Sequence, residues 1–99
     1  MWTKEVLDRL NKELSIEVND DTIFFYDRIN LIPIRRNPKN NYREYTEEDY
    51  LKLSKAIILS KTFDIPLIDI DKILNKKDKA LEKKYKTLLT RHLNKLRKL

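Results

Sequence analysis

The sequence predicts a mainly α-helical fold with one small β-hairpin and a long C-terminal helix. Apolar residues recur at helical spacing in five separate segments. Between two of these segments, short extended runs flank a cluster of turn-forming residues. The length of 99 residues suffices for one compact domain with an appended element, but not for two independent cores.

The first two helices are predicted from apolar spacing and capping residues. The segment Thr3–Leu14 carries apolar residues that share one helical face, namely Val6, Leu7, Leu10 and Leu14. Asn19 is a favourable N-cap for a second helix to about Ile29, with Asp20 and Asp21 in its first turn, where carboxylates complement the helix dipole. Asn30 follows where helices often end on a left-handed residue, and Asn is the best substitute for Gly, which this chain lacks.

A small hairpin is predicted next. The segments Ile32–Arg36 and Tyr42–Tyr45 are extended candidates, and they are separated by Asn37-Pro38-Lys39-Asn40-Asn41. This linker is dense in turn formers, which favours a tight reversal between two short strands.

Three helices are predicted after the hairpin. Thr46 and the acidic residues behind it begin a helix that runs to about Lys61, and Asp64-Ile65-Pro66 breaks it. A short helix over Leu67–Leu74 follows, and then a long one over Asp78–Lys98. Two short helices followed by a basic hairpin form the outline of a winged helix-turn-helix.

The long helix has an apolar stripe that favours self-association. On a helical wheel its apolar face spans an arc of about 140°. It comprises Leu81, Tyr85, Leu88, Leu89, His92, Leu93, Leu96 and Leu99. Little of the chain remains to cover such a stripe, which favours a dimer seam over an internal brace or a basic arm for nucleic acid.

The net charge of +6 is unevenly distributed. Residues 1–27 hold three basic and seven acidic side chains, whereas residues 28–43 hold five basic side chains and no acidic one. Residues 76–99 carry ten basic residues against two acidic ones. Because local clusters set the local potential, the central island of positive charge points to a polyanion more directly than the isoelectric point does.

Several function classes find no support in the residues. Without Cys the chain cannot form disulfides or thiolate metal sites, and His92 is the only histidine. No nucleophile–base pair and no Gly-rich phosphate loop is visible, so we expect no enzyme, metal or cofactor. No apolar run approaches the roughly 20 residues that span a bilayer, and a cytoplasmic, nucleoid-associated location is expected.

At this point the residues resemble a known family. Thr22-Ile23-Phe24-Phe25-Tyr26-Asp27-Arg28-Ile29-Asn30-Leu31-Ile32-Pro33 is similar to the second-helix pattern of MerR-type regulators. Arg35-Arg36 and Asn41-Tyr42-Arg43-Glu44-Tyr45-Thr46-Glu47-Glu48-Asp49 resemble the segment that follows in that family. The short helix matches too, at Leu67, Ile70, Ile73 and Leu74.

The resemblance implies a homodimer that binds double-stranded DNA. In that family the second helix enters the major groove, and the hairpin, called the wing, contacts phosphates. An antiparallel coiled coil joins the two protomers. Residues 1–75 would form the DNA-binding domain and residues 76–99 the dimerisation helix. The contacts of the wing with phosphate would be made by Arg35, Arg36, Lys39, Tyr42 and Arg43. The contacts of helix two with DNA would be made by Asp20, Asp21, Phe24, Phe25 and Arg28. The dimer would be joined through Leu81, Tyr85, Leu88, Leu89, His92 and Leu96.

The chain departs from the family pattern at several positions. Asn30 and Asn41 replace glycines, which is tolerable because Asn accepts positive φ. Phe24 stands where Arg is usual, and Asp20 and Asp21 stand where basic or neutral residues are expected. With Leu99 as the last residue we expect no effector domain, and therefore no small-molecule effector within this chain.

The residues leave three functions open. The first is sequence-specific transcription regulation, with Asp20, Phe24 and Arg28 projecting together from helix two to read bases. The second is an architectural, excision or chromosome-anchoring role that uses the same DNA contacts. The third is a protein-interaction module, in which the acidic start of helix two docks on a partner protein and the wing is merely a solvated turn.

Overall fold

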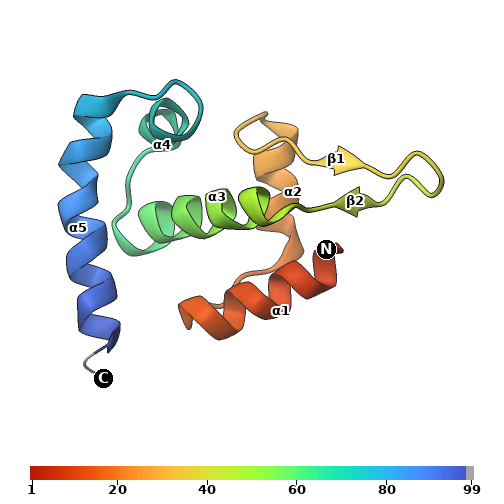
Figure 1. Cartoon of the computed structure of the whole chain (residues 1–99), viewed down its shortest axis with the longest axis horizontal. Helices are drawn as coiled ribbons and strands as arrows, with labels where there is room; N and C mark the ends of the chain where they lie inside the picture. The colour runs from red at the N-terminus through yellow and green to blue at the C-terminus, as the bar shows by residue number, and fades with distance from the viewer. Residues whose placement is uncertain (98–99) are drawn as a thin grey trace. The chain divides into compact units, whose positions relative to one another are not determined.

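The computed structural model describes residues 1–97 and divides the chain into two compact units, Met1–Ala56 and Ile57–Leu99. The predicted mainly helical fold with one small hairpin is confirmed (Figure 1). The elements in chain order are α1 (Thr3–Leu14), α2 (Asp20–Arg28), β1 (Arg35–Arg36), β2 (Arg43–Glu44), α3 (Glu47–Ile57), the π-helical turn η1 (Ile58–Thr62), α4 (Leu67–Leu74) and α5 (Lys79–Arg97).

The first unit packs α1, α2 and most of α3 around an apolar core, and the hairpin extends away from these helices (Figure 1). Leu10, Ile23 and Leu53 contribute one fully buried side chain from each helix. The other buried residues of this unit are Val6, Val18, Tyr26, Leu31, Ile32, Ile34, Tyr45, Tyr50 and Ala56. Burial of these side chains removes apolar surface from water and is the main favourable term in folding the unit.

The end of α2 explains why the first strand is shorter than the sequence predicts. Asn30 is left-handed, with φ 64°, and the next two amides turn back on the helix: Leu31 N and Ile32 N donate to the carbonyl of Tyr26 at 2.9 and 3.1 Å. Both amides donate to this one helix carbonyl and are therefore unavailable to a ladder. As a result only Arg35–Arg36 pairs, and the longer strand predicted from Ile32 is wrong in its extent.

A cluster of polar side chains links α1 to α3. The guanidinium of Arg9 donates through Nη1 and Nη2 to Glu47 at 2.7 Å each, and through Nε to Glu13 at 3.1 Å. It also lies over the ring of Tyr50, 3.8 Å from the centroid. The hydroxyl of Tyr50 donates to Glu13 Oε2 at 2.6 Å. Glu13 and Glu47 thus each accept hydrogen bonds on both carboxylate oxygens, which stabilises the ionised form of each group.

These contacts make the fold sensitive to acid. Hydrogen bonds from Tyr50 and Arg9 hold the pKa of Glu13 below its ordinary value, and the bond from Arg9 does the same for the pKa of Glu47. A carboxyl whose pKa is lower in the folded state stabilises the fold above its unfolded pKa, here 4.5. That stabilisation is lost as the pH falls through the folded pKa.

We therefore expect the urea midpoint of the wild type to be steady from neutral pH to about pH 5 and to fall below that. An Arg9→Met variant removes the common donor, so its midpoint should be lower at neutral pH and should change less on acidification. Lys52→Met is the control, because it removes a basic residue from a loose surface ion pair: the Lys52 Nζ lies 3.7 Å from Oε1 of the exposed Glu48. Parallel pH curves for the wild type and Arg9→Met would contradict this account.

The second unit begins where α3 changes its winding. The sequence predicts one helix to about Lys61, but the α-helix ends at Ile57 and the π-helical turn Ile58–Thr62 follows. Four consecutive residues, Ala56 to Leu59, are buried, which regular α-helical periodicity does not allow on a single face. Asp64 then takes a left-handed φ of 54°, and Ile65 N donates to the carbonyl of Leu59 at 3.0 Å to close the segment.

The last two helices pack within this second unit. The short helix α4 buries Ile70 and Ile73 and has the predicted bounds. Asp78 caps α5 by accepting from Leu81 N at 3.0 Å, and Tyr85 donates its hydroxyl to Asp69 of α4 at 3.4 Å. None of the helices in residues 1–97 is both long enough and apolar enough to cross a bilayer.

Candidate nucleic-acid interface

The predicted wing is a short antiparallel hairpin with a tightly bonded turn. Its register sets Arg35 opposite Glu44 and Arg36 opposite Arg43. Beyond the strands, Asn37 N donates to the carbonyl of Tyr42 and Asn41 N to that of Asn37, both at 2.8 Å. The Asn37 side chain accepts from Lys39 N at 2.8 Å, a local bond by which Asn favours turns.

The turn is completed by Asn40 and by the backbone conformation of Asn41. The side chain of Asn40 accepts from Tyr42 N at 3.0 Å. Asn41 takes a φ of 61°, the left-handed conformation expected of a residue that replaces Gly. Hydrogen bonds to the Asn side chains thus fix the backbone at the tip of the wing, including the amides of Lys39 and Tyr42.

Arg43 anchors the wing to α2. Its Nε donates to Asp27 Oδ2 at 2.8 Å, and both side chains are largely covered, with 18% and 16% exposed. The other oxygen of Asp27 accepts from Ile34 N at 3.1 Å, in the segment leading into β1. One carboxylate therefore holds both strands of the hairpin against α2.

Phe24 completes this anchor. The guanidinium of Arg43 lies over the Phe24 ring, 4.0 Å from its centroid. This is an attractive geometry for a cation and a π-system. The aromatic residue that stands where the family has Arg therefore contacts the wing, so Phe24 and Arg43 form a unit with Asp27.

The other wing cations project into solvent. Arg35 is 78% exposed and approaches Glu44 at 3.6 Å, a loose surface pair. Arg36 is exposed and donates from Nη1 to the carbonyl of Asn41 at 3.1 Å. Lys39 is exposed, and Tyr42 is 65% exposed. The hairpin thus presents Arg35, Arg36, Lys39 and Tyr42 outward.

The exposed face of α2 carries two acidic residues, one aromatic residue and one basic residue. Asp20, Asp21 and Arg28 are exposed, as is Phe25 with 38%. The guanidinium of Arg28 lies 6.0 Å from the ring centroid of Phe25, whereas Phe24 faces Arg43. The aromatic next to Arg28 on the open surface is therefore Phe25, whereas Phe24 is half-buried and contacts Arg43.

The N-terminal segment lies beside the wing. Tyr45 N donates to the carbonyl of Met1 at 2.8 Å, and the amino group of Met1 donates to the carbonyl of Tyr45 at 2.9 Å. This pairing brings the ring of Trp2 edge to face with Tyr42, at 6.3 Å between centroids and 87° between planes. A cleft of about 310 Å³ opens here, lined by Trp2, Thr3, Lys4, Phe24, Arg36, Asn41, Tyr42 and Arg43.

Asp27, Trp2 and Lys4 lie at the wing or line the cleft beside it, but they are not among the contact residues predicted from the sequence. For Asp27 a signal was available, because an acid that immediately precedes a basic island is well placed to pair with it. The positions of Trp2 and Lys4 depend on backbone pairing 44 residues apart in the chain. No local pattern encodes that pairing.

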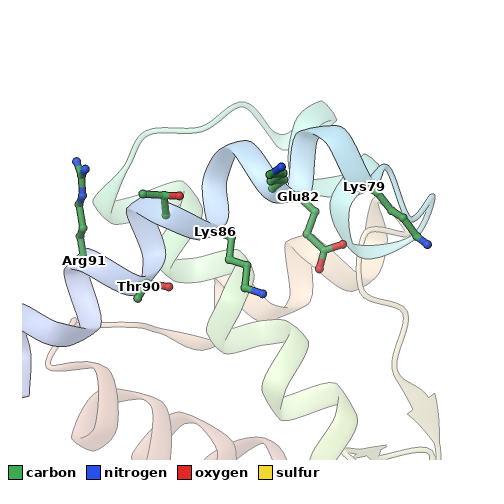
Figure 2. Close-up of a pocket in the computed structure, with 7 residues that line it drawn as sticks. Lys79, Glu82, Lys86, Thr90 and Arg91 are labelled. Carbon is green, nitrogen blue, oxygen red and sulfur yellow. The ribbon is translucent and has the colours of Figure 1, made fainter.

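One face of α5 is polar and cationic. Lys79, Glu82, Lys83, Lys86, Thr87, Thr90 and Arg91 line an open groove of about 730 Å³ along the helix. Figure 2 draws these residues as sticks projecting from α5, with Lys79, Glu82, Lys86, Thr90 and Arg91 labelled. Their spacing of three and four residues places them together, on the side opposite Leu81, Tyr85 and Leu88.

The predicted dimer contacts are only partly described. Leu81 and Tyr85 are half-buried, and Leu88 is exposed with 37%. The side chains of Leu89, His92, Leu93 and Leu96 lie outside the described part of the structure, as does Leu99 altogether. Within the described residues, no group of three or more His, Asp or Glu side chains is placed to hold a metal ion.

The amino-acid sequence is similar to a known protein family and to a known regulator. The family described as "MerR HTH family regulatory protein" matches residues 13–77. The "Transcriptional regulator BrlR" of Pseudomonas aeruginosa (strain ATCC 15692) is 36% identical over 84 residues. The match covers 82% of this chain and 30% of that relative, so the chain spans less than a third of the relative's length.

Proposed function

The chain belongs to the MerR family of helix-turn-helix regulatory proteins, and from this membership we propose that it regulates transcription by binding duplex DNA as a homodimer. In this proposal the wing contacts phosphates, α2 enters the major groove and α5 joins two copies. The proposed place of action is the bacterial nucleoid in the cytoplasm.

The observation that carries the proposal is the anchored, cation-bearing wing. Arg35, Arg36 and Lys39 are exposed on a hairpin whose base is fixed by the Asp27–Arg43 pair. Phosphate contacts supply most of the sequence-independent affinity of DNA-binding proteins, and a preorganised hairpin loses little conformational entropy on binding. Tyr42 adds an exposed hydroxyl, and Arg43 both positions the wing and lines the adjoining cleft.

Base reading is assigned to the exposed face of α2. Arg28 suits guanine or phosphate, Phe25 suits sugar or thymine methyl groups, and the carboxylates of Asp20 and Asp21 can accept from cytosine. The acids also repel phosphates, so they restrict the ways in which the helix can approach DNA. Phe24 acts in this scheme through Arg43, by holding the wing in place.

Dimerisation is assigned to the apolar stripe of α5. Leu81, Tyr85 and Leu88 recur four and three residues apart, as in a coiled-coil seam, and Leu88 is exposed in the single chain. Leu89, His92 and Leu96 extend this stripe in the sequence. Residues 1–75 then act as the DNA-binding domain and residues 76–99 as the dimerisation helix.

The test is binding of a labelled random-sequence duplex at several salt concentrations, with wild type and an Arg35→Gln/Arg36→Gln variant. The wild type should bind at low salt and weaken steeply as salt rises. The variant should bind every duplex on the order of 10-fold more weakly or worse, and its log-log salt slope should be shallower by nearly one unit for each phosphate that it no longer neutralises.

Lys12→Gln serves as the matched control, because Lys12 is also a cation but lies in the last turn of α1, at the end opposite the N-terminal segment that pairs with Tyr45. It should bind like the wild type. If wild type fails to bind duplex at low salt, the DNA-binding proposal is wrong and a protein partner for α2 becomes the better account.

A further inference from the structure

The cleft between the N-terminal segment, α2 and the wing has the chemistry of a nucleotide site. Its volume of about 310 Å³ lies at the lower end of the usual range for ligand pockets. Lys4 and Arg36 are exposed on its lining, and neither forms an ion pair within the described residues. None of the residues that line the cleft is acidic, so its charge favours an anion.

The aromatic side of the cleft is unusually open to solvent. Trp2 is 42% exposed and Tyr42 is 65% exposed. Their contact is edge to face, so it covers only part of each ring. Aromatic rings beside cations are the combination by which proteins hold single-stranded nucleic acid, because the ring stacks on a base while the cation meets the phosphate. In a duplex the bases are already stacked, so a ring beside the phosphates can cover the apolar face of a sugar.

We propose that this cleft holds one nucleotide of the bound duplex beside the wing, with Lys4 and Arg36 on its phosphate and the Trp2 ring against its deoxyribose. This inference rests on the proposed DNA binding and adds the N-terminal segment to the interface. Tyr42 belongs to both the wing tip and the cleft lining, so a strand contacted by the wing passes the mouth of the cleft.

The chain offers a direct reporter, because Trp2 is its only tryptophan. We would measure acrylamide quenching of Trp2 fluorescence with and without a random-sequence duplex, while the anisotropy of a label on the duplex reports binding in the same sample. The quenching constant should fall several-fold on complex formation. A Trp2→Ala variant should bind the duplex several-fold more weakly, because the apolar contact with the deoxyribose is lost.

Lys4→Gln tests the phosphate contact without disturbing packing, because Lys4 is exposed. This variant should reduce the log-log salt slope by nearly one unit, the value for one phosphate, whereas Lys12→Gln on the same helix should not change it. If the duplex binds while Trp2 stays as quenchable as in the free protein, or if Lys4→Gln behaves like Lys12→Gln, the cleft is not a nucleotide site and the proposed function stands. If no duplex binds at low salt, both proposals fail.

Discussion

Replacing Leu88 with Lys is expected to convert the proposed dimer to a monomer and to weaken duplex binding about 100-fold or more. Leu88 is exposed in the single chain, so the change should leave the folded monomer intact. In the dimer the new charge would be buried in the seam, where an unpaired cation is strongly unfavourable. A monomer has one wing and one copy of α2, and it loses the gain in affinity from two linked binding sites.

Thr87→Lys is the matched control for this variant. It introduces the same side chain at the neighbouring position, but Thr87 lies on the cationic face of α5. It should remain dimeric and bind duplex at least as well as the wild type. Sedimentation equilibrium and duplex titrations give both quantities. A wild type that stays monomeric at high concentration, or a Leu88→Lys variant that stays dimeric, would show that this stripe is not the seam.

Replacing Asp27 with Ala is expected to cost about 3 kcal/mol of unfolding free energy, because it leaves a largely covered guanidinium without its partner. For a domain of this size that corresponds to a drop in melting temperature of roughly 15 °C. The variant also removes the acceptor for Ile34 N, so both strands of the wing lose their attachment to α2. Duplex binding should therefore weaken on all sequences even below the melting transition.

Asp27→Asn distinguishes the two bonds, because it retains an oxygen for Ile34 N and removes the charge that faces Arg43. It should show a smaller loss of stability than Asp27→Ala. Glu48→Gln is the control for an exposed pair and should change the unfolding free energy by less than about 0.5 kcal/mol. If Asp27→Ala melts like Glu48→Gln, the anchoring role of Asp27 is refuted.

Local signals in the sequence predict most of the elements correctly. The bounds of α1 and α4 follow from apolar spacing, because each helix buries one narrow stripe that the 3.6-residue period reveals. Asn19 caps α2, accepting from Thr22 N at 3.4 Å, and Asn30 and Asn41 take left-handed conformations. Each of these features depends on a residue's own conformational preferences, and such preferences are readable without a structure.

Features that depend on distant contacts could not be predicted in this way. The π-helical turn after Ile57 accommodates a run of buried residues that one face of a regular α-helix could not hold. The charge pattern indicates an island of five basic residues between Arg28 and Arg43 with no acid inside it, but the acids at its two borders fold onto it. Asp27 forms an ion pair with Arg43, and Glu44 forms a looser one with Arg35. The sequence thus identifies the wing, while only the structure separates its anchor from its exposed cations.

The most direct test of the central claim is a titration of the ¹⁵N-labelled protein with a random-sequence duplex at low salt, followed by amide chemical shifts. The account predicts the largest changes in the wing, residues 35–43, with further changes on the exposed face of α2 at Asp21, Phe25 and Arg28. Shifts confined to α5, or no shifts at all, would contradict the claim that the wing and α2 form the DNA-binding surface.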